Sequence, residues 1–417
     1  MEVNKTMDPL VQKKKKAILC LGVLLYFLTT MSKVLVPATI LDELLGLGTL
    51  SMVQISLLGG CFWYAYAISQ LLAGIFSDRY GGVRILLLGG SFFTIGALGF
   101  PLSTSFSQML CFRILAGLGA GTAFLGIAKL LADLYSRNYS IAMGTVLFIA
   151  FLGTPCGTSP MTALVKASGW RVAMLLPGAV ALVAQIAILS LSKGTIQPAR
   201  RGNALLPLWK MIHNGKMWMI CIPSSIMYGA YYMIITLIGQ KSLTDIFEMN
   251  CITAARIMLF LTFFVAGMTM GVNALLRLFG NRRKATALLG GGCTVAGVIA
   301  GYLSFSGTGA LPLLIIAYFL LAIPGGFFAL FCTIGKELNP PEDTGLAVAA
   351  INFMASSAVA TFQYFGGMIL GQFPLVEQHV PMEAYQTLFK VLAGIACCGI
   401  IPLLCLPETN IDSSHAH

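Results

Sequence analysis

Residues 74–84 read Gly-Ile-Phe-Ser-Asp-Arg-Tyr-Gly-Gly-Val-Arg and separate two long apolar stretches, 52–76 and 83–104. A helix of about 20 apolar residues spans the roughly 30 Å hydrocarbon core of a bilayer, so each stretch is long enough to cross a membrane. The charged turn between them is therefore expected at a membrane surface. Its basic residues predict the cytoplasmic surface, because short cytoplasmic loops are enriched in lysine and arginine.

The composition of the whole chain excludes a soluble globular protein. Hydrophobic residues make up 57% of the 417 residues and charged residues 10%, and the mean hydropathy is +0.86. A soluble domain carries about a quarter charged residues. The net charge of +11 does not indicate nucleic acid, because the lysines and arginines gather in alternate short loops. This positive-inside pattern predicts that both termini are cytoplasmic.

The apolar stretches predict an all-α polytopic membrane protein with twelve transmembrane helices. The second half repeats the alternation of apolar stretches and short loops seen in the first half. This repeat favours two pseudo-symmetric six-helix bundles of the kind that rock around a central site. The predicted segments are a basic cytoplasmic tail (1–16), an N-terminal bundle (17–192), a cytoplasmic linker (193–216), a C-terminal bundle (217–407) and a cytoplasmic tail (408–417). A continuous fifth span is expected over 140–165.

The turn at 74–84 closely resembles the signature loop between helices 2 and 3 of the major facilitator superfamily. The matching residues are Gly74, Asp78, Arg79 and Gly81, and Arg84 supplies a basic charge. Arg113, followed by Gly117, Gly119 and Gly121, is similar to the arginine and glycine pattern of the fourth helix in that family. A pattern associated with antiporters in the fifth helix is matched only in part, because Thr158 stands where that pattern has proline.

The resemblance implies a secondary transporter that works by rocker-switch alternating access, and neither an enzyme nor a protein with a metal or other cofactor. It also implies that Asp78 faces the start of helix 11 near 343–345. We expect Asp78 and Arg79, with Gly74, Gly81 and Arg84, to latch the two halves in the outward-open state. A monomer is expected. Short loops favour a bacterial inner membrane as the location.

Charges inside the predicted spans indicate the substrate class. An ionisable residue at mid-span costs about 2.5–3.5 kcal/mol, so it is a functional candidate by default. Lys33 and Arg113 lie in the outer halves of helices 1 and 4, which by the family resemblance line the central cavity. No acidic residue and no histidine falls at mid-span. Two cations at similar depth predict a small anionic substrate. The alternative for Lys33 is that it extends to the outer surface.

Polar aromatic and amide side chains are the further candidates for substrate binding, because they fix a polar ligand within apolar walls. The residues chosen are Tyr64, Tyr66, Tyr228, Tyr231, Tyr232 and Asn352, and Trp63, Gln70, Gln363 and Tyr364 lie near them in the sequence. Packing alone is the competing explanation for each of them.

The hypothesis is therefore a transporter of a small organic anion, such as a carboxylate, an amino-acid derivative or a phosphate ester, that is coupled to protons by symport or exchanges anions. Two alternatives stay open: a proton-coupled exporter of hydrophobic compounds, and a nutrient sensor that keeps the fold without transport. A membrane enzyme is disfavoured, because the spans lack the histidines and carboxylates of a catalytic or metal site.

Overall fold

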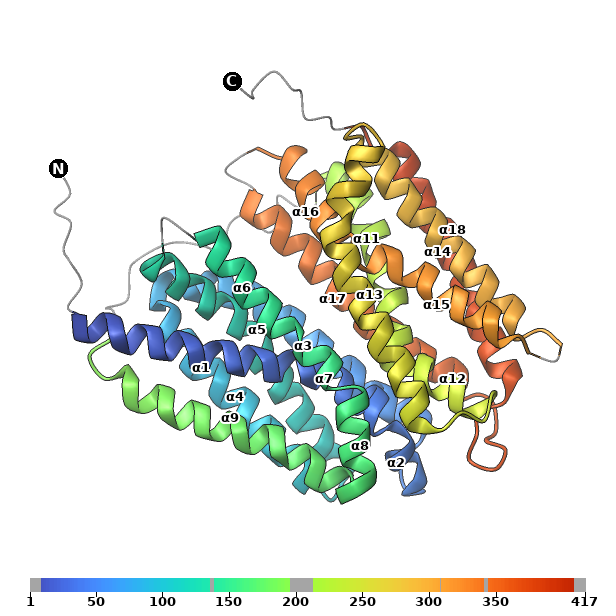
Figure 1. Ribbon diagram of the computed structural model, residues 1–417, viewed down its shortest axis with the longest axis horizontal. Coiled ribbons are helices and arrows are strands. Elements are labelled where there is room, and N and C mark those ends of the chain that lie inside the picture. Colours follow the sequence, from blue (N-terminus) through green and yellow to red (C-terminus); the bar gives the residue numbers. More distant parts are fainter. Residues whose placement is uncertain (1–8, 136–138, 196–212, 308, 341–343, 409–417) are drawn as a thin grey trace. The chain divides into compact units, whose positions relative to one another are not determined.

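The computed structural model describes residues 9–135, 139–195, 213–307, 309–340 and 344–408 (Figure 1). The side chains of 73–79, 140, 141, 344 and 345 are also outside the description. Most of the predicted linker at 193–216 and parts of both predicted tails, 1–16 and 408–417, therefore lie outside the described residues. The division at that linker stays a prediction.

The described residues are helical almost throughout, and their one extended pairing is an isolated bridge between Val376 and His379. Eleven helices are long and apolar enough to cross a membrane, and a pair bent by 44° supplies a twelfth span if it is counted as one. The predicted all-α polytopic membrane fold is thus confirmed.

The chain forms two compact units. Unit 1 comprises Met1–Val34 and Tyr64–Ala204, and unit 2 comprises Leu35–Trp63 and Leu205–His417. The boundary therefore falls inside two helical spans, Pro9–Thr39 and Met52–Leu72. The far end of the first span, the following turn and the first part of the second span pack with the C-terminal helices.

Unit 1 is a bundle whose helices run along one another (Figure 1). Within it α4 packs along α5 and α9, and α1 packs along α5 and α9. A buried amide joins two of these helices, because Gln185 Nε2 donates to the carbonyl of Leu87 at 2.6 Å and lies 3.0 Å from Ser91 Oγ. The helices of this unit are α1 (Pro9–Val34), the later part of α3 (Met52–Tyr80), α4 (Gly82–Leu102), α5 (Phe106–Leu134), α6 (Tyr139–Phe151), α7 (Gly153–Cys156), α8 (Ser159–Ser168) and α9 (Trp170–Ser192).

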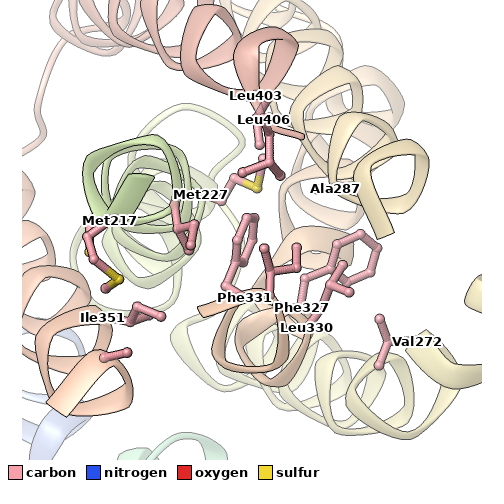
Figure 2. Close-up of a cluster of buried hydrophobic side chains, with 14 of the residues drawn as sticks. Met217, Met227, Val272, Ala287, Phe327, Leu330, Phe331, Ile351, Leu403 and Leu406 are labelled. Carbon is pink, nitrogen blue, oxygen red and sulfur yellow. The ribbon is translucent and has the colours of Figure 1, made fainter. Parts of the chain in front are cut away.

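Unit 2 contains the remaining helices and a large apolar core. Figure 2 shows buried side chains from α11, α13, α14, α16, α17 and α18 that meet around Phe327 and Phe331. Besides the first part of α3, its helices are η1 (Leu35–Thr39), α2 (Leu41–Gly46), α11 (Gly215–Met233), η3 (Ile234–Ile238), α12 (Gly239–Asp245), α13 (Cys251–Leu278), α14 (Arg283–Ser304), α15 (Leu311–Gly325), α16 (Phe328–Glu337), α17 (Thr344–Leu370) and α18 (Met382–Cys405).

The turn quoted at the outset is shorter than the sequence indicates. Helix α3 continues to Tyr80 and α4 starts at Gly82, so a single residue, Gly81, separates them. Gly81 has φ +79°. Only glycine adopts this left-handed region without steric cost, so Gly81 makes the abrupt change of direction possible.

The fifth span is broken, whereas the sequence predicts a continuous helix over 140–165. Helix α7 ends at Cys156 and α8 begins at Ser159, and the segments on either side differ in direction by 44°. Pro155 and Pro160 flank the break and lack the backbone N–H that a continuous helix needs. Thr158 Oγ1 donates to the carbonyl of Pro155 at 2.7 Å and so satisfies a carbonyl at the break.

Candidate functional site

Lys33 and Arg113 are buried in unit 1, on helices long and apolar enough to cross a membrane. Lys33, in the last turn of α1, is 5% exposed, and Arg113 on α5 is 2% exposed. A charge at this depth is costly and is retained in proteins chiefly for function. Lys33 and Arg113 are therefore candidates for binding a substrate of opposite charge.

Arg113 reaches across to α1 next to Lys33. Its Nη1 donates to Ser32 Oγ at 3.2 Å and to the Ser32 carbonyl at 3.4 Å. The guanidinium carbon lies 6.0 Å from the centre of the Phe100 ring on α4. These contacts fix the guanidinium beside the residue that precedes Lys33.

Lys33 extends toward α3. Its Nζ lies 4.3 Å from the centre of the Tyr66 ring, which is a cation–π distance. The hydroxyl of Tyr66 accepts a hydrogen bond from Gln70 Nε2 at 2.8 Å. Lys33, Tyr66 and Gln70 thus form one chain of contacts from α1 to α3.

These contacts define the Lys33–Arg113 cluster, which consists of Ser32, Lys33, Tyr66, Gln70 and Arg113. The predicted residues Lys33, Tyr66 and Arg113 all lie in unit 1, where Lys33 contacts Tyr66 and Arg113 contacts Ser32, the residue before Lys33. Sequence reasoning missed Ser32, and nothing in the spacing of the sequence pairs it with Arg113.

Tyr64 lies apart from the cluster. It is 38% exposed, and Ile68 and Leu72, four and eight residues later, are 49% and 44% exposed. Residues four apart share one face of a helix. Tyr64 therefore belongs to an exposed, mainly apolar stripe of α3.

The predicted substrate residues of the C-terminal half lie in unit 2. The ring centres of Tyr228 and Tyr232 are 4.6 Å apart, and those of Tyr231 and Tyr232 are 5.2 Å apart. Trp63 meets Tyr232 edge-on at 4.9 Å. Asn352 is half-buried on α17. The three tyrosines and Trp63 form an aromatic group within this unit.

The predicted latch falls largely outside the described side chains. Gly74, Asp78 and Arg79 belong to helix α3, but the side chains of 73–79 are not described, and neither are residues 341–343. Gly81 is the turn residue, and Arg84 is half-buried on α4. The latch stays a prediction. Among the described residues no three His, Cys, Asp or Glu side chains gather as ligands for a metal.

Comparison with known proteins identifies the family. Residues 18–307 match the model of the Major Facilitator Superfamily, which is well over half of the 417 residues. A segment is 31% identical over 118 residues to the 4-hydroxybenzoate transporter PcaK of Pseudomonas aeruginosa, covering 28% of this chain and 26% of that protein. Another is 35% identical over 129 residues to the probable 4-methylmuconolactone transporter of Cupriavidus pinatubonensis, covering 30% of each. The matched segments thus span less than a third of these relatives.

Solved structures show the same fold at low sequence identity. The peptide transporter POT in complex with sulfate has a TM-score of 0.72 at 12% identity and covers 94% of each chain. The nucleoside transporter NupG has a TM-score of 0.69 at 13% identity and covers 95% of this chain and 99% of its own. The match over residues 18–307 shows that the chain belongs to the major facilitator superfamily.

Proposed function

We propose that the protein transports a small organic carboxylate by alternating access, and that the Lys33–Arg113 cluster binds the carboxylate. The observation that carries this proposal is that two buried basic side chains meet α1 at consecutive positions: Lys33 itself, and Arg113, whose guanidinium bonds to Ser32. A buried cation is stabilised by an anion that arrives with the substrate, because opposite charges attract strongly where water is excluded.

The two cations have different roles in this proposal. Arg113 presents a planar fork that matches the two oxygens of a carboxylate, and its bonds to Ser32 hold the fork in place. Lys33 is a point charge whose contact with the Tyr66 ring replaces part of its hydration when no substrate is bound. A carboxylate competes with that weaker contact and draws Lys33 toward itself.

The names of several relatives support the choice of an organic anion. Besides the 4-hydroxybenzoate transporter, the relatives include the cis,cis-muconate transport protein of Acinetobacter baylyi and the gallate transporter of Pseudomonas putida. These compounds are carboxylates at neutral pH. Tyr228, Tyr231, Tyr232 and Asn352 remain proposed substrate contacts contributed by unit 2, and Tyr64, which is 38% exposed on α3, remains one contributed by unit 1.

We also propose an orientation for the protein, with both termini in the cytoplasm of a bacterium and the chain in its inner membrane. Basic residues gather where α1, α5 and α9 meet one another at one end of unit 1. Lys15 Nζ forms an ion pair with Asp133 at 2.9 Å, and Lys14 Nζ donates to the carbonyl of Lys193 at 3.4 Å. Lysine-rich ends of membrane helices favour the cytoplasmic side.

Uptake by proteoliposomes tests this function. Wild-type protein is expected to take up a labelled aromatic or dicarboxylic acid. Arg113→Gln is expected to reduce uptake by about tenfold or more, since a hydrogen bond to a charged group is worth about 1.5–3 kcal/mol. Arg171→Gln is the matched control, because Arg171 lies in the same unit but contacts Trp170 and the Ser103 carbonyl instead. Equal uptake by wild type and Arg113→Gln contradicts the proposal.

A further inference from the structure

Unit 2 contains a second group of charged side chains, which the proposed substrate site does not use. Lys241 Nζ on α12 lies 2.7 Å from Asp42 Oδ1 on α2 and 2.8 Å from Asp245 Oδ1 on its own helix. One buried ammonium thus bridges two carboxylates from distant parts of the chain. We call Asp42, Lys241, Asp245, His379 and Tyr385 the Asp245 cluster.

Asp245 is the fixed member of this cluster. Its side chain is 0% exposed, and His379 Nδ1 lies 2.9 Å from Oδ1. The other oxygen, Oδ2, accepts from the backbone N–H of Val380 and from the hydroxyl of Tyr385, both at 2.9 Å. A buried carboxylate with both oxygens satisfied is held firmly. Asp245 therefore anchors Lys241 to the segment that leads into α18.

Asp42 is held in a different way. Its side chain is 32% exposed, and its ion pair in the described part of the chain is with Lys241. It lies on α2, between η1 and α3, in the segment Leu35–Trp63 that groups with the C-terminal helices. The same segment makes a second contact, because η1 packs against η3, the turn that directly precedes α12. Both are π-helical turns, which occur often at functional positions.

This asymmetry makes separation of Asp42 from Lys241 inexpensive. Removing one partner of a buried ion pair is usually costly, because the other charge is left without compensation. Lys241 has a second partner that would limit that penalty, since Asp245 Oδ1 on its own helix lies 2.8 Å from its ammonium. Asp42, being a third exposed, is hydrated as soon as it leaves.

We propose that the Asp42–Lys241 ion pair is a releasable lock that holds α2 and η1 against α12 and η3 in one state of the transport cycle, with Asp245 as its permanent anchor. The segment 35–63 is continuous with α1 and with the later part of α3, which belong to unit 1. A movement of unit 1 is therefore transmitted to α2 through the chain at both ends of this segment. The role of the lock in alternating access rests on the proposed function, and the orientation proposed above places it on the outer side.

Hydrogen exchange measured by mass spectrometry on the full-length protein in lipid nanodiscs tests the lock without any substrate. Asp42→Asn is expected to speed exchange in peptides over 35–46 and 234–245 by about threefold or more, because the local opening loses an ion pair. Asp42→Glu keeps the charge and is expected to restore most of the protection. Glu248→Gln is the matched control, since Glu248 is an exposed acid three residues beyond Asp245.

A second variant separates the lock from general destabilisation. Asp245→Asn is expected to speed exchange over 376–388 as well, because it loosens the contacts to Val380 and Tyr385. Asp42→Asn is expected to leave that region as protected as in the wild type. Unchanged exchange over 35–46 in Asp42→Asn, or an equal rise throughout unit 2, overturns the proposal. Because no transport is measured, either result leaves the anion site to be judged by uptake alone.

Discussion

Arg113 donates hydrogen bonds to both the hydroxyl and the carbonyl oxygen of Ser32, at 3.2 and 3.4 Å. The contact joins α5 to α1 one residue before Lys33. It explains how a guanidinium that is 2% exposed is kept in a defined orientation inside a membrane helix bundle. It also links the orientation of Arg113 to the position of the α1 segment that carries Lys33.

Removing the Ser32 hydroxyl should weaken the anion site without removing its charges. Ser32→Ala deletes one acceptor of a charged hydrogen bond, which is worth about 1.5–3 kcal/mol. The expected result is an affinity for the carboxylate that is weaker by about ten- to a hundredfold, since about 1.4 kcal/mol corresponds to a factor of ten. Isothermal titration with the transported acid measures it.

The control for this variant is Ser190→Ala. Ser190 is exposed, and its hydroxyl bonds the carbonyl of Ala187 in its own helix at 2.8 Å. Affinity should be unchanged there. A Ser32→Ala protein that binds the acid as tightly as the Ser190→Ala protein speaks against a positioning role for Ser32.

The ring of Tyr66 should matter more than its hydroxyl. Tyr66→Phe keeps the aromatic face 4.3 Å from Lys33 and loses the hydrogen bond from Gln70. Tyr66→Leu loses the face, so the ligand-free protein should be less stable by about 0.5–2 kcal/mol. Thermal unfolding of the purified variants should rank wild type and Tyr66→Phe above Tyr66→Leu.

Tyr64→Leu provides the comparison, because Tyr64 is 38% exposed on the apolar stripe of α3. It should unfold at nearly the temperature of the wild type. If Tyr66→Phe is as unstable as Tyr66→Leu, then the hydrogen bond from Gln70, and not the cation–π contact, supports Lys33.

The turn at Gly81 should tolerate no side chain. Its φ of +79° places any other residue in a strained conformation, so Gly81→Ala should destabilise the protein by about 1–2 kcal/mol. Gly144→Ala is a helical control whose added methyl group meets no atom within 4 Å. That change should be neutral or stabilising by up to about 1 kcal/mol. Chemical unfolding in mild detergent that finds the two variants equally stable would refute the assignment of strain to Gly81.

Much of this fold is predictable from the sequence because a bilayer allows few solutions. Apolar stretches of membrane length, the loop at 74–84 and the alternation of basic loops indicate the family and an all-helical fold. The exact turn was less predictable: α3 continues through charged residues to Tyr80, because its backbone hydrogen bonds continue regardless of side-chain polarity. The fifth span was predicted as continuous, although Pro155 and Pro160 interrupt it.

The site was predictable in part. Lys33 and Arg113 are conspicuous because charges are rare in membrane spans, and Tyr66 was selected as a polar aromatic residue. The partnership of Ser32 with Arg113 spans 81 residues and depends on how α1 and α5 pack, which hydropathy does not encode. The same holds for Asp42 and Lys241, which look like ordinary helix-end charges until the fold places them together.

Ligand-dependent thermal unfolding of the purified protein tests the central claim most directly. A panel of organic carboxylates, neutral sugars and lipophilic cations is added to the wild type, Lys33→Ala, Arg113→Gln and Arg171→Gln. A ligand at a hundred times its dissociation constant stabilises the folded state by about 2.7 kcal/mol. We predict stabilisation by one class of carboxylates in the wild type and Arg171→Gln, and its loss in Lys33→Ala and Arg113→Gln. Stabilisation by lipophilic cations alone, or by carboxylates regardless of Arg113, would contradict the anion site and favour the export of hydrophobic compounds.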